Sequence, residues 1–487
     1  MLGCGESGRH KTWRMAEPAV MDAAIPAYRA WGPREGPTGN VSGGNSCGAQ
    51  ARMQPRVISG GSKLAVHSSW HHHRDCVVFL DPRQRPRFGH EPVKICVLGE
   101  GGREHALAWA AARFGHDVVV VPGNAGNPWS AEVEPSGADL YVLGSDDSVC
   151  SGQGDRLRAA GHLVFGPNAD GGQLEGSKQW MKSLLIEAGV PTARHGSFAD
   201  AAPAEAYLRT LAAGYVVKTD YLALGKGVLV TDDLDEAIAD ARVKLKHGRV
   251  VVEEKLAGVE FSLLAVCDGK RAVLLPAAMD HKGIFDGNLG PNTGGMGAVA
   301  PVPRIREDVV EAAFEQCVRP TLDALRARGI DYRGVLYGGP LILTTEGPKV
   351  VEWNVRFGDP EAQVLLPLFE SDPYELLAEA AAGSITSIPR FSDRTAVTVV
   401  LASEGYPGTP RVGDPIEGWA DANELPDVTV FSAGVGPGGV TKGGRVLNVT
   451  ALGADVHDAR ARAYDAVAKI RWPGMQYRRD IAAGALA

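Results

Sequence analysis

The chain has 487 residues, enough for about three domains of ordinary size, so a single small binding module is not expected. Hydrophobic residues make up 44% and charged residues 22%, a composition that favours a folded globular protein over a disordered or coiled-coil chain. No apolar run reaches the ~18 residues that span a bilayer, and the N-terminus lacks the pattern of a secretory signal. We therefore expect a cytoplasmic protein with no membrane partner, and the net charge of −8 disfavours nucleic acid as a partner. The seven cysteines include no C-x-x-C pair and are expected to be free thiols.

Residues 1–92 differ in kind from the rest of the chain. They hold 12 Lys and Arg against 7 Asp and Glu, whereas 93–487 carry a net charge of −13. Gly, Pro, Ser and Arg are abundant and apolar periodicity is almost absent, so we expect this extension to be mostly disordered. The cluster His71, His72 and His73 could bind a metal, but consecutive side chains point in different directions, which favours a solvated tract. Because a folded pattern begins abruptly at Val93, the alternative is a misassigned start, with a GTG codon at Val93 as the initiator.

From Lys94 onward, short apolar strands alternate with helices. Strands are predicted at Lys94–Leu98, Asp117–Val121, Leu140–Leu143 and Leu163–Phe165, with a helix at Arg103–Arg113 after the first strand. This alternation is typical of a parallel sheet, so we expect an α/β domain at 93–191 that closes with a helix over about 172–188.

Two further domains are predicted, at 192–386 and 387–487. The first opens with a compact α+β unit at about 192–260, with helices at 201–213 and 234–245 and strands at 215–219, 227–231 and 250–254. Longer strands are predicted at 260–267, 272–278, 332–343 and 349–353, with a helix at about 307–328. The last domain mixes strands at 396–402 and 446–451 with a helix at 456–470. The predicted fold class is α/β and α+β multidomain, with a parallel N-terminal domain and a small mixed β/α C-terminal domain.

A glycine-rich turn joins the first strand to the first helix, with the sequence Gly99-Glu-Gly-Gly-Arg-Glu-His105. Its glycines let the backbone approach an anion at the helix N-terminus. A dinucleotide fold would need a glycine where Glu104 stands and an acidic residue after the second strand, where Pro122 and Gly123 stand. NAD is therefore disfavoured, and a bare strand–helix turn is about as well supported by this loop alone as phosphate binding.

Lys218 and Lys226 lie on adjacent predicted strands around a glycine turn. Each ammonium could neutralise a nucleotide phosphate, although the sequence is not a Walker A motif and a solvated hairpin is the alternative. The next strand ends in Glu253 and Glu254, which could hydrogen-bond an adenine amino group and ribose hydroxyls. Two surface glutamates are the ordinary interpretation of that piece in isolation.

The loop Gly290–Gly297 has four glycines in eight residues, which expose backbone donors to an anionic ligand. A flexible linker is the alternative. More specific is the run that begins on the strand ending near Trp353, where a period of two places Glu352, Asn354 and Arg356 on one face. Two oxygen ligands for Mg²⁺ would then lie beside a cation that can hold a carboxylate or phosphate. A buried apolar strand would not place three polar groups on one face without such a use.

These pieces belong to a longer series of motifs in the same order. They are GEGGREHALAW (Gly99–Trp109), PGNAG (Pro122–Gly126), FGP (Phe165–Pro167), LEGSK (Leu174–Lys178), Asp280-His281-Lys282, GPNTGGMG (Gly290–Gly297), EWNVRFGDPE (Glu352–Glu361), GYPG (Gly405–Gly408) and GGRVLNVTALG (Gly443–Gly453). With this series, the chain from about 93 to 481 resembles the phosphoribosylamine–glycine ligases (glycinamide ribonucleotide synthetases), ATP-grasp enzymes of purine biosynthesis. The extension 1–92 has no counterpart in that family.

The resemblance implies an ATP-grasp domain at 192–386 with a lid at about 192–260, and a reaction that joins 5-phosphoribosylamine to glycine through an acyl phosphate. ATP and Mg²⁺, with Mn²⁺ as an alternative, are the implied cofactors, and a monomer or weak homo-oligomer is implied. The implied nucleotide-binding residues are Lys178, Lys218, Lys226, Glu253, Glu254, Leu256 and Glu260, and the metal ligands are Glu352 and Asn354. The implied catalytic residues are Arg356, Lys226, Asn292 and Asp286. The implied substrate-binding residues are Gly101, Gly102, Arg103, Asn124, Thr293, Gly294, Gly295, Arg356 and Asp359.

Four departures from the family pattern put the amine substrate in question. The connection 127–138 is short, Asp146 stands in an altered Gly-Pro-Glu loop, Tyr221 replaces a lid glycine, and Gly283 replaces an arginine. A tyrosine prefers φ < 0 and adds a bulky ring, so we expect the lid loop to follow another path or to close less well. The alternatives are a paralogous ligase for another amine or amino acid and a catalytically dead homologue, although the intact ATP and metal positions count against the second.

Overall fold

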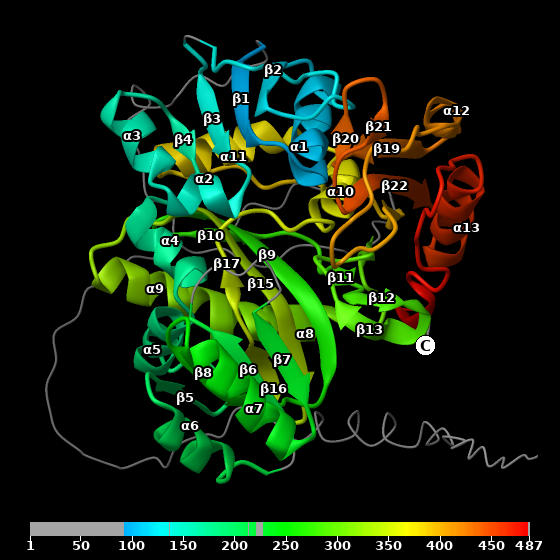
Figure 1. The fold of residues 1–487 in the computed structure, drawn as a ribbon. Coiled ribbons are helices and arrows are strands. Elements are labelled where there is room, and N and C mark those ends of the chain that lie inside the picture. The colour runs from blue at the N-terminus through cyan, green and yellow to red at the C-terminus, as the bar shows by residue number, and fades with distance from the viewer. Residues whose placement is uncertain (1–91, 136, 213, 221–226, 486–487) are drawn as a thin grey trace, which may run out of the picture. The chain divides into compact units, whose positions relative to one another are not determined.

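The computed structural model describes residues 92–135, 137–212, 214–220 and 227–485. The predictions for 1–91, including the histidine cluster, and those for Tyr221 and Lys226 lie outside the described residues. Figure 1 shows the described chain as a series of sheets flanked by helices. None of the described helices is long and apolar enough to cross a membrane.

The N-terminal sheet is parallel, as predicted. Its strands are β1 (Lys94–Gly99), β2 (Asp117–Pro122), β3 (Leu140–Leu143) and β4 (Val164–Phe165), in the order β2-β1-β3-β4. Strands β1 and β3 are apolar and almost wholly buried, as expected where helices cover both faces of a parallel sheet. Helix α1 (Gly102–Arg113) begins directly after β1, and the short helices α2 (Asp146–Cys150) and α3 (Gln153–Ala159) follow β3.

Two long predicted helices are interrupted. Instead of one helix over 172–188, α4 (Ala169–Gly176) ends and α5 (Lys178–Glu187) begins at Ser177, whose hydroxyl accepts a hydrogen bond from the Trp180 amide. A serine side chain is better suited to capping the N-terminus of a helix than to a position inside one. A new helix therefore begins directly after Gly176-Ser177. The helix over 307–328 is α8 (Glu307–Ala313), a π-helical turn (Phe314–Val318) and α9 (Arg319–Ala327), because Pro320 lacks the amide donor that a regular helix needs there.

The unit over 195–254 is an antiparallel sheet with two helices and its own apolar core. Strands β5 (His195–Phe198), β6 (Tyr215–Thr219), β7 (Val228–Thr231) and β8 (Val250–Glu254) run in the order β5-β8-β6-β7. Helices α6 (Ala201–Leu208) and α7 (Leu234–Leu245) pack against them through buried side chains such as Leu208, Val217, Ile238 and Val252. Helix α6 ends five residues before the predicted bound.

The central sheet has the order β10-β9-β15-β16. Its strands are β9 (Val259–Asp268), β10 (Ala272–Leu274), β15 (Arg333–Thr344) and β16 (Gly347–Val350), and the two-residue strand β17 (Trp353–Asn354) pairs with β15. Strands β9 and β15 run antiparallel over most of their length, with a register shift between Gly338 and Leu341. Helices α10 (Ala362–Leu365) and α11 (Pro373–Ala382) follow the sheet in the chain.

The last sheet mixes strands from two parts of the sequence. Strand β22 (Arg445–Gly453) pairs with β18 (Thr395–Ala402) on one side and with β19 (Val428–Ser432) on the other, and β14 (Gly297–Ala300) and β11 (Met279–Asp280) extend the sheet beyond β18. Helix α13 (Val456–Val467) packs on β18 and β22, and the small elements α12 (Trp419–Asn423), β20 (Val435–Gly436) and β21 (Val440–Thr441) complete this region (Figure 1). The hairpin β12 (Gly283–Phe285) and β13 (Leu289–Asn292) precedes β14, so the loop before β14 is tied to the C-terminal sheet. The boundary at 387 stays a prediction.

Candidate active site

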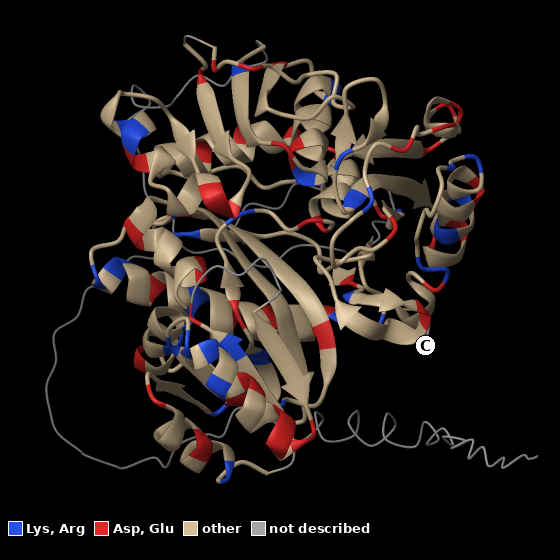
Figure 2. Ribbon diagram, in the orientation of Figure 1, with Lys and Arg blue, Asp and Glu red and all other residues tan. Residues whose placement is uncertain are grey.

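A pocket of about 470 Å³ lies where α1, α2, α4, α5, β7, β15, β17 and the C-terminal sheet meet. Five cationic and six acidic side chains line it, so bound ligands must be highly polar or charged. The cations are Arg103, Lys178, Lys282, Arg356 and Arg445, and the carboxylates are Asp146, Glu175, Asp280, Glu352, Asp359 and Glu361. Figure 2 shows that Lys, Arg, Asp and Glu are interspersed over the rest of the described ribbon as well.

The N-terminus of α1 forms one wall of the pocket. The Glu104 carboxylate accepts hydrogen bonds from the Gly101 amide (2.6 Å) and from Nε of Arg103 (2.7 Å), and Arg103 also donates to the Phe357 carbonyl (3.1 Å). A Cβ at Gly99 or Gly144 would approach the buried Glu104 side chain to within 2.7 Å. Glu104 therefore packs against Gly99 and Gly144 while it accepts the Gly101 amide, a role that a glycine at this position could not fill.

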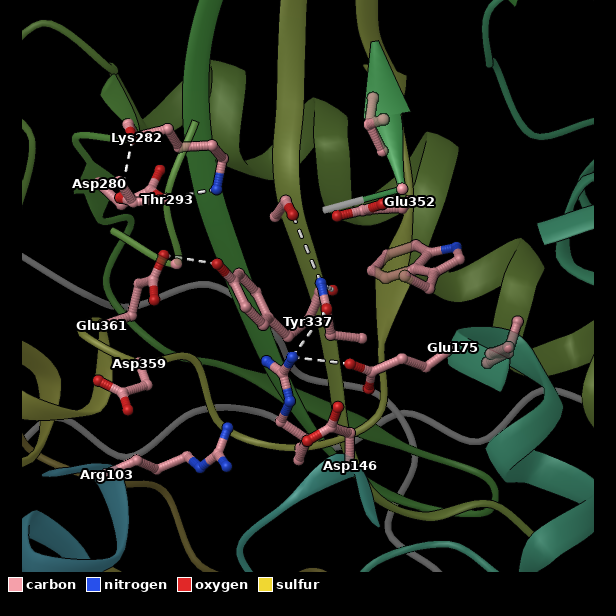
Figure 3. A pocket seen from close by; sticks show the side chains of 18 of the residues that line it. Arg103, Asp146, Glu175, Asp280, Lys282, Thr293, Tyr337, Glu352, Asp359 and Glu361 are labelled. Carbon is pink, nitrogen blue, oxygen red and sulfur yellow. Dashed lines mark hydrogen bonds and ion pairs between the residues drawn. The ribbon is translucent and has the colours of Figure 1, made fainter. Parts of the chain in front are cut away.

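The predicted metal ligands Glu352 and Asn354 and the cation Arg356 all line the pocket, and Figure 3 shows Glu352 within it. Only Asn354 belongs to the two-residue strand β17, which Glu352 and Arg356 flank. Nη2 of Arg356 donates to Oδ1 of Asn354 (3.1 Å) and to the Glu175 carboxylate (2.7 Å). The other Glu175 oxygen accepts from the Val355 amide (2.9 Å), so Glu175 holds this segment at two points. Burial raises the pKa of Glu175, and the adjacent Arg356 guanidinium opposes that rise.

A second polar network lies on the opposite side of Tyr337 from Glu352 (Figure 3). The buried Glu361 carboxylate accepts from the Tyr337 hydroxyl (2.5 Å) and from Ser262 (3.1 Å), and Lys282 forms an ion pair with Asp280 (2.5 Å). Burial raises the pKa of Glu361, and the nearby negative charge of Asp280 raises it further. Although burial opposes it, Asp280 raises the pKa of Lys282, so the ammonium stays charged.

The glycine-rich loop is held from the C-terminal sheet. Nη1 of Arg445 donates to the carbonyls of Gly294 (2.8 Å) and Asp359 (2.7 Å), and Nη2 pairs with the Asp359 carboxylate (3.2 Å). The Tyr406 hydroxyl accepts from the Gly294 amide (3.1 Å). Gly295 has φ +112°, and a Cβ there would approach Pro360 to within 2.5 Å, so this position requires glycine. Although burial opposes it, Arg445 and Arg103 lower the pKa of Asp359.

The structure brings together eight of the predicted residues as pocket lining. These are Arg103, Lys178, Thr293, Gly294, Glu352, Asn354, Arg356 and Asp359. Gly101 and Gly102 lie at the start of α1 beside them, and Gly295 adjoins Gly294.

Other predicted residues lie outside the lining. Asn124 is buried and donates to the carbonyls of Glu100 (2.9 Å) and Ser432 (3.3 Å), which makes it a link between two loops. Asp286 accepts from the Arg479 amide (2.7 Å), and Asn292 is exposed at the end of β13.

The residues predicted for adenine and ribose surround the end of β8. Glu254 accepts from the Arg194 amide (2.9 Å), Leu256 is half-buried and Glu260 is exposed. Lys218 and Glu253 are buried as an ion pair (3.0 Å).

Sequence reasoning gave no role to several side chains that complete the pocket. Glu175, Asp280, Lys282, Tyr337, Glu361, Tyr406 and Arg445 are the main ones. All except Tyr337 stand inside motifs of the series quoted above, so membership of a collinear motif was the available signal. Tyr337 lies in an apolar strand and gave none.

Comparisons with known proteins identify the class. Residues 176–362 match the ATP-grasp (A) domain of phosphoribosylglycinamide synthetase, 93–175 match its N domain and 396–484 its C domain. The fold is also similar to the biotin carboxylase domain of a Hydrogenobacter thermophilus 2-oxoglutarate carboxylase, solved with MgADP. That likeness (TM-score 0.61, 16% identity, 79% of this chain and 91% of that one) concerns the fold alone. The protein is therefore an ATP-grasp enzyme.

Closer relatives define the family. The phosphoribosylamine–glycine ligase of Leifsonia xyli is 46% identical over 418 residues, covering 81% of this chain and all of the relative. That of Caulobacter vibrioides is 44% identical, covering 80% and 98%. The crystal structure of the Thermotoga maritima phosphoribosylamine–glycine ligase superposes with a TM-score of 0.71 at 35% identity, covering 80% of this chain and all of that one. The chain belongs to the phosphoribosylglycinamide synthetase family.

Proposed function

We propose that this protein joins glycine to 5-phosphoribosylamine, with ATP converted to ADP and phosphate, and so forms glycinamide ribonucleotide in de novo purine biosynthesis. Family membership over all three domains supports the reaction. Among this chain's own residues, the observation that supports the reaction is that Glu352, Asn354 and Arg356 line one charged pocket. We further propose that the protein acts in the cytoplasm.

The donor set fits Mg²⁺, with Mn²⁺ as an alternative. Glu352 and Asn354 offer a carboxylate and an amide oxygen, the hard ligands that Mg²⁺ prefers. Among the described residues there is no group of three or more His, Cys, Asp or Glu that could hold a metal. A magnesium site with few protein ligands, completed by nucleotide phosphates, is the arrangement that such a donor set supports. When bound, the ion would neutralise charge on the transferring phosphoryl group.

The proposed reaction brings several negative charges into the pocket. The glycine carboxylate attacks the terminal phosphorus of ATP, the bond to ADP breaks, and an acyl phosphate forms. The amine of phosphoribosylamine then attacks the acyl carbon, phosphate leaves with the bonding electron pair, and the new amide nitrogen loses a proton. Lys178 and Arg356 line the pocket and would disperse this charge. The amides of Thr293, Gly294 and Gly295 donate within the protein, to the Lys282 carbonyl (2.8 Å), the Tyr406 hydroxyl (3.1 Å) and the Thr293 hydroxyl (2.9 Å), so the loop shapes this wall of the pocket without supplying a free donor from these three residues.

Exclusion of water is the role that we assign to residues 192–260. An acyl phosphate hydrolyses readily, so the intermediate must be covered while the amine binds. The separate apolar core of this unit supports movement as one body, because its helices and strands would keep their own packing during closure.

A glycine-dependent assay tests the proposal. Purified protein is given ATP, Mg²⁺ and glycine, and ADP release is measured with and without freshly made phosphoribosylamine. We expect rapid ADP release only with all components, together with formation of glycinamide ribonucleotide. Absence of that product despite ATP binding would contradict the proposed reaction.

A paralogous ligase acting on another amine is the second candidate. Asp146, which belongs to the loop that departs from the family pattern, lines the pocket, so that departure lies within the site. The same assay with other primary amines separates the two functions. A faster reaction with a different amine than with phosphoribosylamine would favour the paralogue.

A further inference from the structure

Three buried charged side chains meet beside the pocket, two cations and one anion. Lys182 of α5 donates to one Glu253 oxygen (3.1 Å), and Lys218 of β6 pairs with the other (3.0 Å). Their side chains are at most 2% exposed. No role follows for Lys182 from the motifs or from the proposed reaction as described so far.

We propose that Lys182 is a positioning residue for ATP binding, which keeps Glu253 neutralised when Lys218 turns to a nucleotide phosphate. The inference rests on the proposed function, because it takes ATP as the ligand. Lys218 touches the phosphate in this scheme, and Lys182 acts through Glu253.

The positions of the two lysines support the division of roles. Lys178 lines the pocket at the start of α5, and Lys182 lies one turn further along the same face of that helix. Nζ of Lys218 also approaches the carbonyl of Val351 (3.4 Å), next to Glu352. Lys182 instead donates to Thr192 (2.7 Å), the first residue of the 192–260 unit, and Thr192 donates to the Val350 carbonyl (2.6 Å).

Charge balance gives the physical reason. A buried carboxylate left without a cation is strongly unfavourable, so a single lysine paired with Glu253 could not leave it for a phosphate. With two lysines the trio carries one net positive charge, and one ammonium can serve an incoming anion. Burial lowers the pKa of Lys182 to about 8, and the nearby Lys218 lowers it as well, although Glu253 opposes both, as expected for two ammoniums sharing one carboxylate. Together the lysines hold the pKa of Glu253 below its ordinary value despite its burial.

The test is nucleotide affinity in full-length protein with Lys182→Met. Dissociation constants for ADP with Mg²⁺ and for adenosine are measured by competition against a fluorescent nucleotide. We expect ADP to bind about tenfold or more weakly, the order of magnitude of one charge-assisted hydrogen bond, and adenosine to bind as in the wild type, because it lacks phosphates. Equal weakening of both ligands would indicate a distorted adenine site and overturn the inference.

Two further variants make the result specific. Thr192→Val removes the other hydrogen-bond partner of Lys182 without changing charge, so ADP affinity should stay close to that of the wild type. The double variant Lys182→Met with Glu253→Gln removes one cation and the anion together and should bind ADP more tightly than Lys182→Met alone. A double variant no tighter than the single one would overturn the charge-balance argument.

Folding does not confound the test. Lys182→Met leaves Lys218 and Glu253 as a neutral pair, so the melting temperature should be unchanged or higher. A strongly lowered melting temperature would show that Lys182 serves the fold and would overturn the inference. Wild-type protein that binds no ADP would overturn the nucleotide site itself, whereas normal ADP binding by folded Lys182→Met would overturn this inference alone.

Discussion

The side chain of Glu352 is the one on which the metal site depends most. Its carboxylate shares the pocket with Asn354 and with five cations, and it is the charged member of the proposed ligand pair. An amide at the same position would keep the shape and lose the charge that a divalent cation requires.

We therefore predict that Glu352→Gln lowers the ligation rate about 100-fold or more, the order expected when a metal ion's charge stabilisation is lost. The melting temperature should be unchanged. ADP release in the complete assay and thermal unfolding check the two parts. Glu346→Gln, a change at an exposed carboxylate six residues earlier, is the control and should retain full activity. Near-normal turnover by Glu352→Gln would remove this residue from the mechanism.

At the residue scale, the sequence predicts those groupings of side chains that follow from local periodicity. Glu352, Asn354 and Arg356 lie together because alternate residues of an extended segment share a face, even where regular pairing lasts for only two residues. Glu361 and Asp280 meet from segments about 80 positions apart, and no local pattern reports such a contact. Burial of a charged side chain such as Lys182 likewise depends on partners from other elements.

At the element scale, interruptions of helices decide where functional residues begin. Helix α5 starts at Lys178, which lines the pocket, and Ser177 caps it by accepting from the Trp180 amide. The Ser177 hydroxyl also donates to Asp220 at the end of β6 (3.1 Å), so the cap ties the helix to the proposed lid.

Loss of this cap should cost stability and nucleotide affinity together. We predict that Ser177→Ala lowers the free energy of unfolding by about 1 kcal/mol, the usual value for an N-cap serine. The Michaelis constant for ATP should rise more than that for glycine, because Lys178 is the first residue of the helix. Urea unfolding and steady-state kinetics measure these effects. Ser183→Ala, in the exposed middle of α5, should change neither, and equal effects of the two variants would contradict the capping argument.

Most predicted elements agree with the structure where period and composition are unambiguous. The strands at 215–219 and 250–254 and the helix at 234–245 have the predicted bounds. The helix predicted over 172–188 did not, because a hydroxyl that competes for backbone amides is invisible to apolar periodicity. The sequence also does not predict which strands far apart in the chain pair with one another, as the addition of β11 and β14 to the C-terminal sheet shows.

At the scale of the whole molecule, the pocket is completed by side chains from the C-terminal sheet. Arg445 joins the glycine-rich loop to the Asp359 segment through two carbonyls and one ion pair. The C-terminal region is thus part of the site, and a change in its packing should alter the binding of the substrates.

Arg445→Lys tests this link. A single ammonium cannot reach both carbonyls and the carboxylate in the geometry of a guanidinium, so we predict a fall in kcat/KM of about tenfold. The fall should appear with glycine and the amine more than with ATP, and kinetics with each substrate varied in turn would show it. Arg411→Lys, a change at a half-exposed arginine of the same region, is the control. Unchanged kinetics in Arg445→Lys would make the arginine dispensable for positioning.

The last prediction concerns the chain upstream of the first strand. The sequence of 1–92 differs in charge from the rest and lacks the apolar pattern that forms a core. Val93 already makes its backbone hydrogen bonds within the described residues. Its amide donates to His116 (3.4 Å), and its carbonyl accepts from the Asp117 amide (3.0 Å). The Leifsonia xyli ligase matches this chain over its whole length while covering 81% of it.

Protein that begins at Val93, with an initiator methionine, should therefore fold with an unchanged melting temperature and keep its kinetic constants for all three substrates. A truncation at Val97 is the matched control, since it removes half of β1 from the centre of the parallel sheet and should leave little soluble product. Expression yield, thermal unfolding and the complete assay distinguish the two. Loss of soluble protein from the Val93 variant would show that the extension is structural, whereas normal folding with altered kinetics would place it near the substrates.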